Sequence, residues 1–105
     1  MASKVAILDI ETTSLEADGG IVVGAGLISE KGQAEYFPVP RTSEEKNVLV
    51  KLVQRLRAFD VVVTWNGRFF DIPFLTTRLL SHGLDPRPVA TIRHLDLNEV
   101  VKNRL

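Results

Sequence analysis

The sequence predicts an α/β domain in which helices pack on a five-stranded mixed sheet. Two observations support this fold class. The first half of the chain has three apolar, β-branched runs separated by polar, glycine-containing segments, which is typical of an antiparallel meander. The second half alternates such runs with longer segments whose apolar residues recur at helical spacing. The predicted order is three strands, then helix, strand, helix, strand and helix, in one domain over residues 1–105.

The first three strands are predicted at residues 4–10, 21–29 and 33–39. In the first, Val5–Leu8 is apolar at consecutive positions, which favours a central strand that is covered on both faces. In the second, Gly24 and Gly26 indicate a close backbone approach or a bulge. Pro38 in the third favours an edge strand, because proline cannot donate a hydrogen bond to a neighbouring strand.

The later elements are predicted as a helix from about residue 43 to 60, a strand over 61–65, a helix over 72–82, a loop over 85–88, a strand over 89–95 and a helix from residue 97. Glu45 suits the N-terminal end of the first helix and completes a capping box with Thr42. Gly83 fits the position just after the second helix. Asp96 is expected to cap the last helix together with Glu99.

The order of the elements also predicts the sheet topology. Right-handed crossovers place the fourth strand parallel to the first and beside it, and the fifth beside the fourth, which gives the order 3-2-1-4-5. Because side chains alternate along a strand, Asp9 and Glu11 leave the first strand on the same face. Asp71 follows the end of the fourth strand. Open α/β sheets bind ligands where the strand order reverses, so this topology brings the three carboxylates to one site.

Three carboxylates without histidine or cysteine ligands predict a site for a hard divalent cation such as Mg²⁺ or Mn²⁺. Two like charges about 4 Å apart repel each other by roughly 4 kcal/mol at an effective dielectric constant of about 20, so cations or protons must offset the repulsion. Two divalent ions in such a site activate water and stabilise the leaving oxygen of a phosphoryl displacement. The alternative for Asp71 alone is a plain helix cap.

Residues 9–15, Asp-Ile-Glu-Thr-Thr-Ser-Leu, and residues 66–71, Asn-Gly-Arg-Phe-Phe-Asp, each stand at the end of a predicted strand. They resemble the first and second motifs of the DEDD (DnaQ-like) 3′–5′ exonucleases of the ribonuclease H-like superfamily. Residues 93–97 resemble the strand-to-helix step of the exonuclease domains of family B DNA polymerases, and stand-alone ribonuclease H-like exonucleases share the same order. The resemblance covers nearly the whole chain. It implies a ribonuclease H-like fold and a nuclease of DNA repair or processing.

The resemblance also implies a role for each matching residue. Those that would hold two Mg²⁺ or Mn²⁺ ions and carry catalysis are Asp9, Glu11 and Asp71. The substrate would be the 3′ end of single-stranded DNA or RNA. Thr12 would contact the terminal nucleotide through a hydrogen bond and Leu15 through apolar contact. Asn66 and Phe70 would line the channel for the single strand, where stacking on an aromatic ring contributes about 1–3 kcal/mol per base.

The chain departs from the family pattern at two places. Ser14 stands where the family usually has glycine. The third exonuclease motif, a tyrosine or histidine four residues before a fourth aspartate, is absent, and the one tyrosine is Tyr36 in the predicted edge strand. We therefore expect a domain that lacks the C-terminal helices of the family, cleaves weakly or not at all, and forms homo-oligomers through bared apolar surface. The alternative is a non-catalytic ribonuclease H-like module that binds nucleic acid or a protein; a ribonuclease H or a junction resolvase fits the two motifs less well.

Several residues around the second motif have structural interpretations. Phe69 and Phe70 are adjacent and point apart, so at most one of them is expected in the core. Trp65 ends a predicted buried strand and is expected to matter mainly for folding. A helix cap is the favoured role for Asp96.

Composition excludes several classes of protein. The chain has no cysteine, which removes disulfides, thiolate metal sites and thiol nucleophiles. Its 13 Lys and Arg residues balance 13 Asp and Glu residues, so no net charge indicates a nucleic-acid partner. Arginines that either solvate a surface or contact phosphates are Arg68, Arg78, Arg87 and Arg93. No apolar run is long enough to span a bilayer and no signal peptide follows Met1, so we expect a cytoplasmic protein without a membrane partner.

Overall fold

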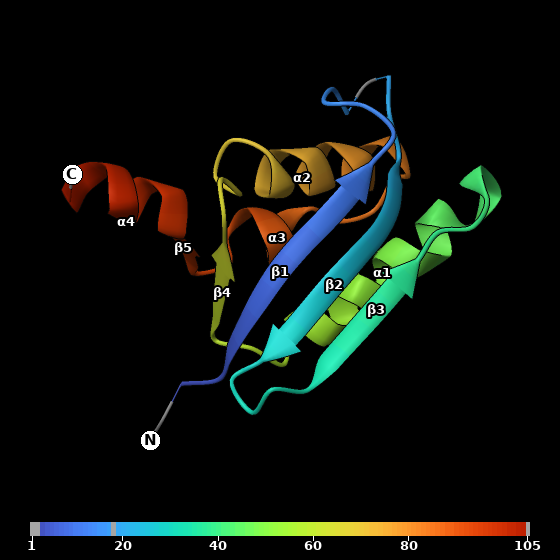
Figure 1. Cartoon of the computed structure of the whole chain (residues 1–105). Coiled ribbons are helices and arrows are strands. Elements are labelled where there is room, and N and C mark those ends of the chain that lie inside the picture. The colour runs from blue at the N-terminus through green and yellow to red at the C-terminus, as the bar shows by residue number, and fades with distance from the viewer. Residues whose placement is uncertain (1–2, 18, 105) are drawn as a thin grey trace.

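Five strands form one mixed sheet in the computed structural model, which describes residues 3–17 and 19–104. Their order across the sheet is β3-β2-β1-β4-β5 (Figure 1). The strands are β1 (Val5–Thr12), β2 (Val22–Ser29), β3 (Ala34–Pro38), β4 (Val61–Thr64) and β5 (His94–Asp96). β1 is antiparallel to β2 and parallel to β4, β2 is antiparallel to β3, and β4 is parallel to β5. The predicted strand order and the antiparallel meander are confirmed.

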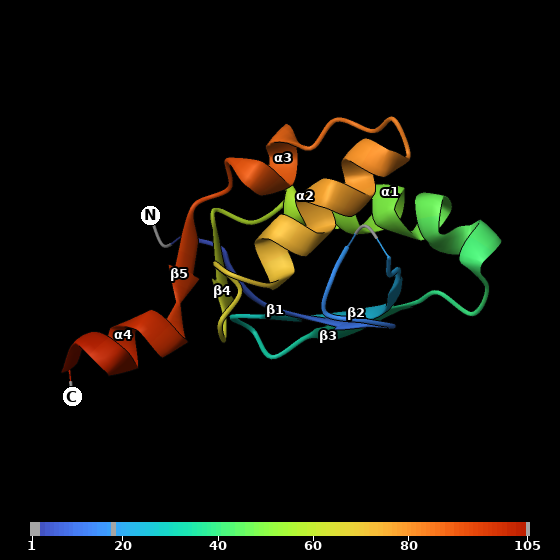
Figure 2. The ribbon, with the colours of Figure 1, turned by 90° about the horizontal axis from the view of Figure 1, so that it is seen from above.

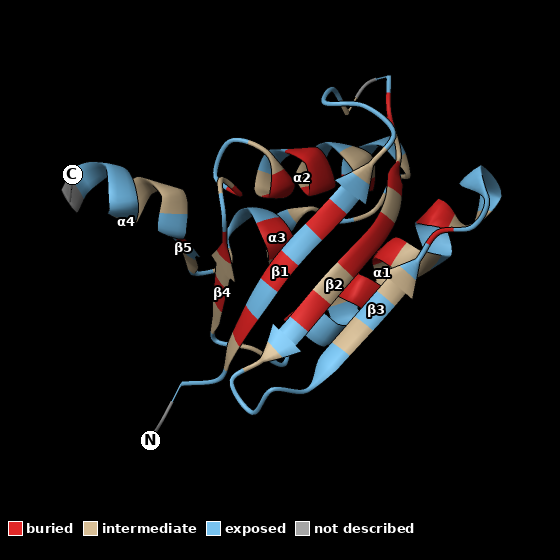
Figure 3. Ribbon diagram, in the orientation of Figure 1, coloured by how far each residue is buried: buried red, intermediate tan, exposed pale blue. Residues whose placement is uncertain are grey.

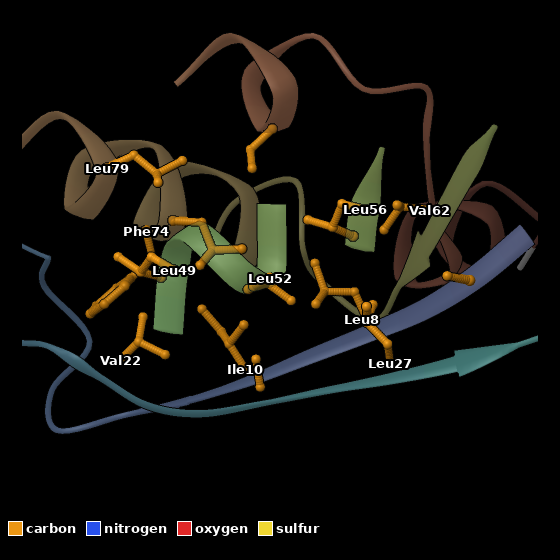
Figure 4. Close-up of a cluster of buried hydrophobic side chains, with 14 of the residues drawn as sticks. Leu8, Ile10, Val22, Leu27, Leu49, Leu52, Leu56, Val62, Phe74 and Leu79 are labelled. Atoms are coloured by element: carbon orange, nitrogen blue, oxygen red, sulfur yellow. The ribbon is translucent and has the colours of Figure 1, made fainter. Parts of the chain in front are cut away.

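The helical elements are the 3₁₀ turn η1 (Thr42–Glu44), α1 (Glu45–Leu56), α2 (Asp71–Ser81), α3 (Arg87–Ala90) and α4 (Leu97–Arg104). Figure 2 shows α1, α2 and α3 on the same face of the sheet, whereas α4 extends away from it beyond β5. The buried apolar side chains lie between that face and the helices, and they include Leu8, Leu27, Leu49, Leu52 and Leu79 (Figure 4). None of the helices in the described ranges is long and apolar enough to cross a lipid bilayer.

Burial alternates along β1, the central strand. Leu8 and Ile10 are buried, whereas Ile7, Asp9 and Glu11 are exposed, which gives the alternating bands in Figure 3. The prediction that both faces of this strand are covered is wrong, because α1, α2 and α3 all lie on one side and leave Ile7 49% exposed. The open face carries Asp9 and Glu11 together, as the strand alternation predicts.

The segment before β5 differs from the prediction. Residues 87–90 form the short helix α3 instead of the loop and the start of a strand, and β5 has only three residues. Proline is favoured in the first turn of a helix, where a missing N–H costs no hydrogen bond; Pro88 stands there and Pro86 directly precedes the helix. The Asp85 Oδ1 accepts a hydrogen bond from the N–H of Arg87 at 3.0 Å. In this helix the side chain of Val89 points into the core, and the residue is only 1% exposed.

Two glycine positions show why the sequence has glycine there. A Cβ on Gly24 would lie 2.1 Å from the hydroxyl oxygen of Tyr36, so the group that closely approaches Gly24 is a side-chain ring and not another backbone segment. Gly83 has a φ of +70°, which favours glycine, and ends α2. The N–H of Leu84 then donates to the carbonyl of Leu79 at 2.9 Å, which satisfies the helix end.

Glu45 is fully buried and does not form the predicted capping box, since no side-chain hydrogen bond caps η1 or α1. Its carboxylate accepts the N–H of Val22 at 2.7 Å. It also lies 2.6 Å from Arg78 Nη2 and 2.6 Å from His82 Nε2. Burial alone would raise the pKa of Glu45, but the hydrogen bonds that it accepts outweigh burial and hold the pKa below its usual value. The cluster ties the start of α1 to β2 and to the end of α2.

Candidate functional site

The site lies where β1 runs on past the end of its parallel neighbour. β1 pairs with β4 only through Val5–Ile7, although β1 itself continues to Thr12. The start of α2 occupies the place beside β1 beyond this pairing. There the Asp71 Oδ2 accepts a hydrogen bond from the N–H of Ile10 at 3.0 Å, within the buried interior. Asp71 thus satisfies a strand N–H that β4 is too short to reach.

The carboxylate of Asp71 is 3% exposed and makes no cap hydrogen bond at the start of α2. The alternative role of a plain helix cap is therefore wrong. Burial raises its pKa, the hydrogen bond from Ile10 partly opposes this, and the nearby charges of Asp9 and Asp96 raise it further, to about 6. A carboxylate held in this way favours a proton or a cation beside it.

The loop between β4 and α2 is held in a tight conformation. Asn66 has a φ of +63°, in the left-handed region that asparagine tolerates better than most residues. The Thr64 Oγ1 accepts the N–H of Gly67 at 2.9 Å. A Cβ on Gly67 would lie 2.2 Å from that oxygen, so this position requires glycine. The carbonyl of Asn66 accepts the N–H groups of Phe69 and Phe70 at 3.3 and 3.1 Å.

Asp96 fixes the same loop from the other side. Its Oδ1 accepts the N–H of Asn66 at 2.7 Å and that of Asn98 at 3.0 Å, and its Oδ2 accepts the N–H of Arg68 at 3.3 Å. Burial alone would raise the pKa of Asp96, but these three hydrogen bonds outweigh it and lower the pKa. The predicted cap of α4 is confirmed by the contact with Asn98. Glu99, the predicted capping-box partner, instead lies 2.9 Å from Arg68 Nη1.

An open groove of about 550 Å³ runs over this loop and the end of β1. Its lining residues are Asp9, Leu15, Trp65, Asn66, Phe69, Phe70, Asp71 and Asn98. Five of these were predicted as site residues from the sequence: Asp9, Leu15, Asn66, Phe70 and Asp71. Two other predicted site residues, Glu11 and Thr12, do not line the groove. Glu11 is exposed on the same face of β1 as Asp9, and the Thr12 hydroxyl donates to the carbonyl of Ser14 at 2.7 Å.

Two aromatic residues of the groove have no site role in the sequence analysis. Trp65 is 61% exposed and Phe69 is 69% exposed. The prediction that Trp65 ends a buried strand is wrong, because β4 ends at Thr64. Strand alternation could have found it, since Val62 and Thr64 face the core and residue 65 therefore points the other way. Phe70 is half-buried with its ring 5.5 Å from that of Phe74, which agrees with at most one core phenylalanine in the pair.

Acidic and amide groups dominate the polar lining of the groove, and no lysine or arginine in the described ranges lines it. Three of the four arginines considered above pair with carboxylates: Arg68 with Glu99, Arg78 with Glu45 and Arg87 with Asp85. The Nε2 of His94 lies 2.6 Å from the Thr64 hydroxyl, and burial lowers the pKa of this histidine. None of these four contacts places a positively charged side chain in the groove.

The donor chemistry of the groove suits a hard divalent cation. Asp9 and Asp71 supply carboxylate oxygens, and Asn66 supplies an amide oxygen, the ligand types that Mg²⁺ and Mn²⁺ prefer. The buried Asp71 carboxylate also gains from a neighbouring positive charge, because its pKa is raised. Within residues 3–17 and 19–104, no group of three His, Cys, Asp or Glu residues lies close enough together to hold a metal ion.

Known structures share this fold. The family B DNA polymerase of Pyrobaculum calidifontis superposes with a TM-score of 0.84 at 22% identity, over 97% of this chain and 16% of that one. A structure of exonuclease I superposes with a TM-score of 0.75 at 14% identity, over 97% of this chain and 30% of that one. At these identities the likeness shows a shared fold.

Sequence comparison identifies relatives and the family. The catalytic chain of DNA polymerase epsilon from Debaryomyces hansenii is 31% identical over 83 residues, which cover 68% of this chain and 4% of that polymerase. The chain thus spans a small fraction of the length of the polymerase that it matches. The family model described as the RNase H superfamily matches residues 6–105. Together with the mixed sheet and the groove at its switch point, this match shows that the chain belongs to the ribonuclease H superfamily.

Proposed function

We propose that this chain is a metal-dependent 3′–5′ exonuclease module that acts on the ends of single-stranded DNA or RNA. The observation that carries the proposal is the buried Asp71 carboxylate, which lies against β1 in the same open groove as Asp9. The exonuclease I structure and the polymerases that this chain is similar to support the reaction class. The carboxylates stand at the switch point of the sheet, where this type of fold binds its ligands.

Each residue has a defined task in this proposal. Asp9, Glu11 and Asp71 would hold two Mg²⁺ or Mn²⁺ ions. When bound, such ions activate water and stabilise the leaving oxygen of the phosphodiester. Leu15 and Thr12 contact the terminal nucleotide. Asn66 and Phe70 position the strand from the other wall of the groove.

We expect cleavage by these 105 residues alone to be weak. The described residues that line the groove include no histidine, tyrosine or lysine to orient or deprotonate the attacking water. General-base assistance typically contributes about 10²–10⁴-fold to a rate, so turnover is expected to fall by at least that factor relative to a complete site. An acidic side chain from a second copy of the chain could restore turnover, but only in an oligomer.

Metal binding is tested by thermal unfolding with and without Mn²⁺. At about one hundred times its dissociation constant, a ligand stabilises the fold by about 2.7 kcal/mol, a rise in melting temperature on the order of ten degrees. Asp9→Asn is expected to abolish this response. The same variant should melt higher than wild type in EDTA, because it removes the charge that raises the pKa of Asp71. Asp85→Asn, an acid outside the groove, serves as the matched control and should keep the Mn²⁺ response.

Cleavage is tested on a single strand labelled at its 5′ end, with Mn²⁺, at protein dilutions from monomer to oligomer. Stepwise shortening from the 3′ end by wild type, absent in Asp71→Asn, is the expected result. Two results together would refute the proposal. The first is that wild type and Asp9→Asn have the same melting temperatures with and without Mn²⁺, and the second is that wild type does not shorten the strand.

The second candidate is a non-catalytic module that binds nucleic acid or a protein. The absence of a three-residue metal group in the described residues favours it, since the exposed aromatic side chains of the groove do not need a metal to bind a strand. Strand binding in EDTA without Mn²⁺-dependent shortening would support this candidate over the first.

A further inference from the structure

We propose that Trp65 and Phe69 form a base-stacking platform that holds single-stranded nucleic acid beside the carboxylates of the groove. The inference rests on the proposed function for the class of ligand, but it requires neither metal nor cleavage. Both residues line the same groove as Asp9 and Asp71. The site roles assigned above fall on Phe70 and Asn66, so the platform adds a second aromatic surface.

The two rings are exposed to an extent that folding does not require. Trp65 keeps 61% of its surface and Phe69 keeps 69%, whereas the adjacent Phe70 packs against Phe74. Large aromatic side chains left in water lose the free energy that burial would give them. A stacked base would cover each ring without a polar group having to be buried.

Hydrogen bonds hold the loop backbone between the two aromatic positions. The backbone N–H groups of Asn66 and Arg68 are bound by Asp96, and that of Gly67 by the Thr64 hydroxyl. These bonds lie between the two aromatic positions, so the loop cannot rearrange without breaking them. A platform that is ordered before binding loses little conformational entropy when a strand arrives.

Arg68 orients the ring of Phe69. Its guanidinium lies 5.8 Å from the centroid of that ring and is itself held by Glu99 at 2.9 Å. A guanidinium covers one face of a ring, and the high exposure of Phe69 leaves room for a base on it. Because Glu99 neutralises Arg68, the pair holds the Phe69 ring in position but adds no net positive charge that would attract phosphates.

The charge of the groove makes stacking the main source of affinity. Two carboxylates line it and, among the described residues, no lysine or arginine does, so phosphate attraction is weak there. Stacking on aromatic rings is tolerant of sequence, because every base has flat faces. The platform therefore fits a single strand with unpaired bases and does not fit a duplex.

Trp65 reports directly on the contact, because it is the one tryptophan in the chain. Its fluorescence is recorded in EDTA with a short oligothymidylate, with an abasic strand of the same length and phosphate count, and with the matching duplex. Strong quenching by the oligothymidylate alone is expected. Phe69→Ala and Trp65→Ala are expected to weaken binding roughly 5- to 100-fold each, with affinity of Trp65→Ala measured by anisotropy of a labelled strand.

Matched variants separate stacking from folding and from other exposed rings. Trp65→Phe keeps an aromatic ring and should bind within a few-fold of wild type, and Tyr36→Ala, which removes an exposed ring of β3, should not change the affinity. Equal quenching by the abasic strand, or binding unchanged in both alanine variants, would overturn the proposal. So would a change in Trp65 fluorescence with protein concentration alone, because it would mean that a second copy covers the ring. Quenching without any Mn²⁺ response would leave the platform standing and refute the nuclease.

Discussion

Arg78 and Glu45 form a buried ion pair between α2 and α1, with Arg78 Nη2 and Glu45 Oε1 2.6 Å apart and 13% and 0% of their side chains exposed. Arg78→Met should remove the guanidinium and leave the buried Glu45 carboxylate with only His82 and the N–H of Val22 as partners. Loss of one partner of a buried pair typically costs about 3–5 kcal/mol of the free energy of unfolding. Urea unfolding of wild type and Arg78→Met at neutral pH measures this loss in the free energy of unfolding. Arg87→Met, which breaks the exposed pair with Asp85, is the control and should leave the midpoint almost unchanged.

The pKa of Asp71 predicts how the stability of the metal-free protein depends on pH. Because the folded state raises this pKa to about 6, it binds a proton more tightly than the unfolded chain does. The contribution of Asp71 to stability is therefore fully present below the unfolded pKa of about 3.9 and is lost as pH rises through 6, by roughly 3 kcal/mol in total. Asp71→Asn keeps an acceptor for Ile10 and removes the titration. The difference between wild type and this variant, measured in EDTA from about pH 4 to about pH 8, should grow with pH; a flat difference contradicts the raised pKa.

Gly67→Ala should destabilise the loop between β4 and α2. Its Cβ would lie 2.2 Å from the Oγ1 and 2.4 Å from the Cβ of Thr64, so the backbone must move. Overpacking of this kind costs about 1–3 kcal/mol. Gly19→Ala, where a Cβ would meet nothing within 4 Å, is the matched control for glycine replacement. Equal melting temperatures for the two variants would show that the loop accommodates the methyl group.

Asp96→Ala should free the loop without emptying the proposed metal site. It removes the acceptor of three backbone N–H groups, those of Asn66, Arg68 and Asn98. Buried donors without a partner cost about 1–3 kcal/mol each, and part of this returns if water replaces the carboxylate. Hydrogen exchange should accelerate at these amides first. Retention of the Mn²⁺ response in Asp96→Ala, beside its loss in Asp9→Asn, would separate a residue that holds the loop from a metal ligand.

The topology was predictable because few arrangements obey the chain-connection rules. Strand order 3-2-1-4-5 follows from right-handed crossovers once the strands are recognised, and the structure agrees. The start of α3 was not predictable in the same way, since Pro86 and Pro88 suit a loop as well as a first helical turn. The open face of β1 was also missed, because consecutive apolar residues do not say on which side the helices pack.

The site was predictable where topology alone decides it. Asp9 and Asp71 meet because β1 and β4 are neighbours and both strands end at the same edge of the sheet. The platform residue Trp65 was missed because it was assigned to a buried strand, although alternation from the inward-facing Val62 and Thr64 turns residue 65 to the open side. Asp96 accepts three hydrogen bonds, and two of the donors, Asn66 and Arg68, lie far from it in the sequence. Local capping rules therefore predict only its contact with Asn98.

The parallel pairing of β1 with β4 also orders the events of folding. Val5 pairs with Val61, so a long loop must close before this contact forms, whereas β1, β2 and β3 are joined in sequence. Contacts between residues distant in sequence form late, because closing the loop loses conformational entropy before the contacts stabilise the chain. We therefore expect Asp9 and Asp71 to come together near the end of folding, so that their mutual repulsion is absent from earlier stages. A cation bound between them would act after the rate-limiting barrier, so it would slow unfolding while leaving the folding rate almost unchanged.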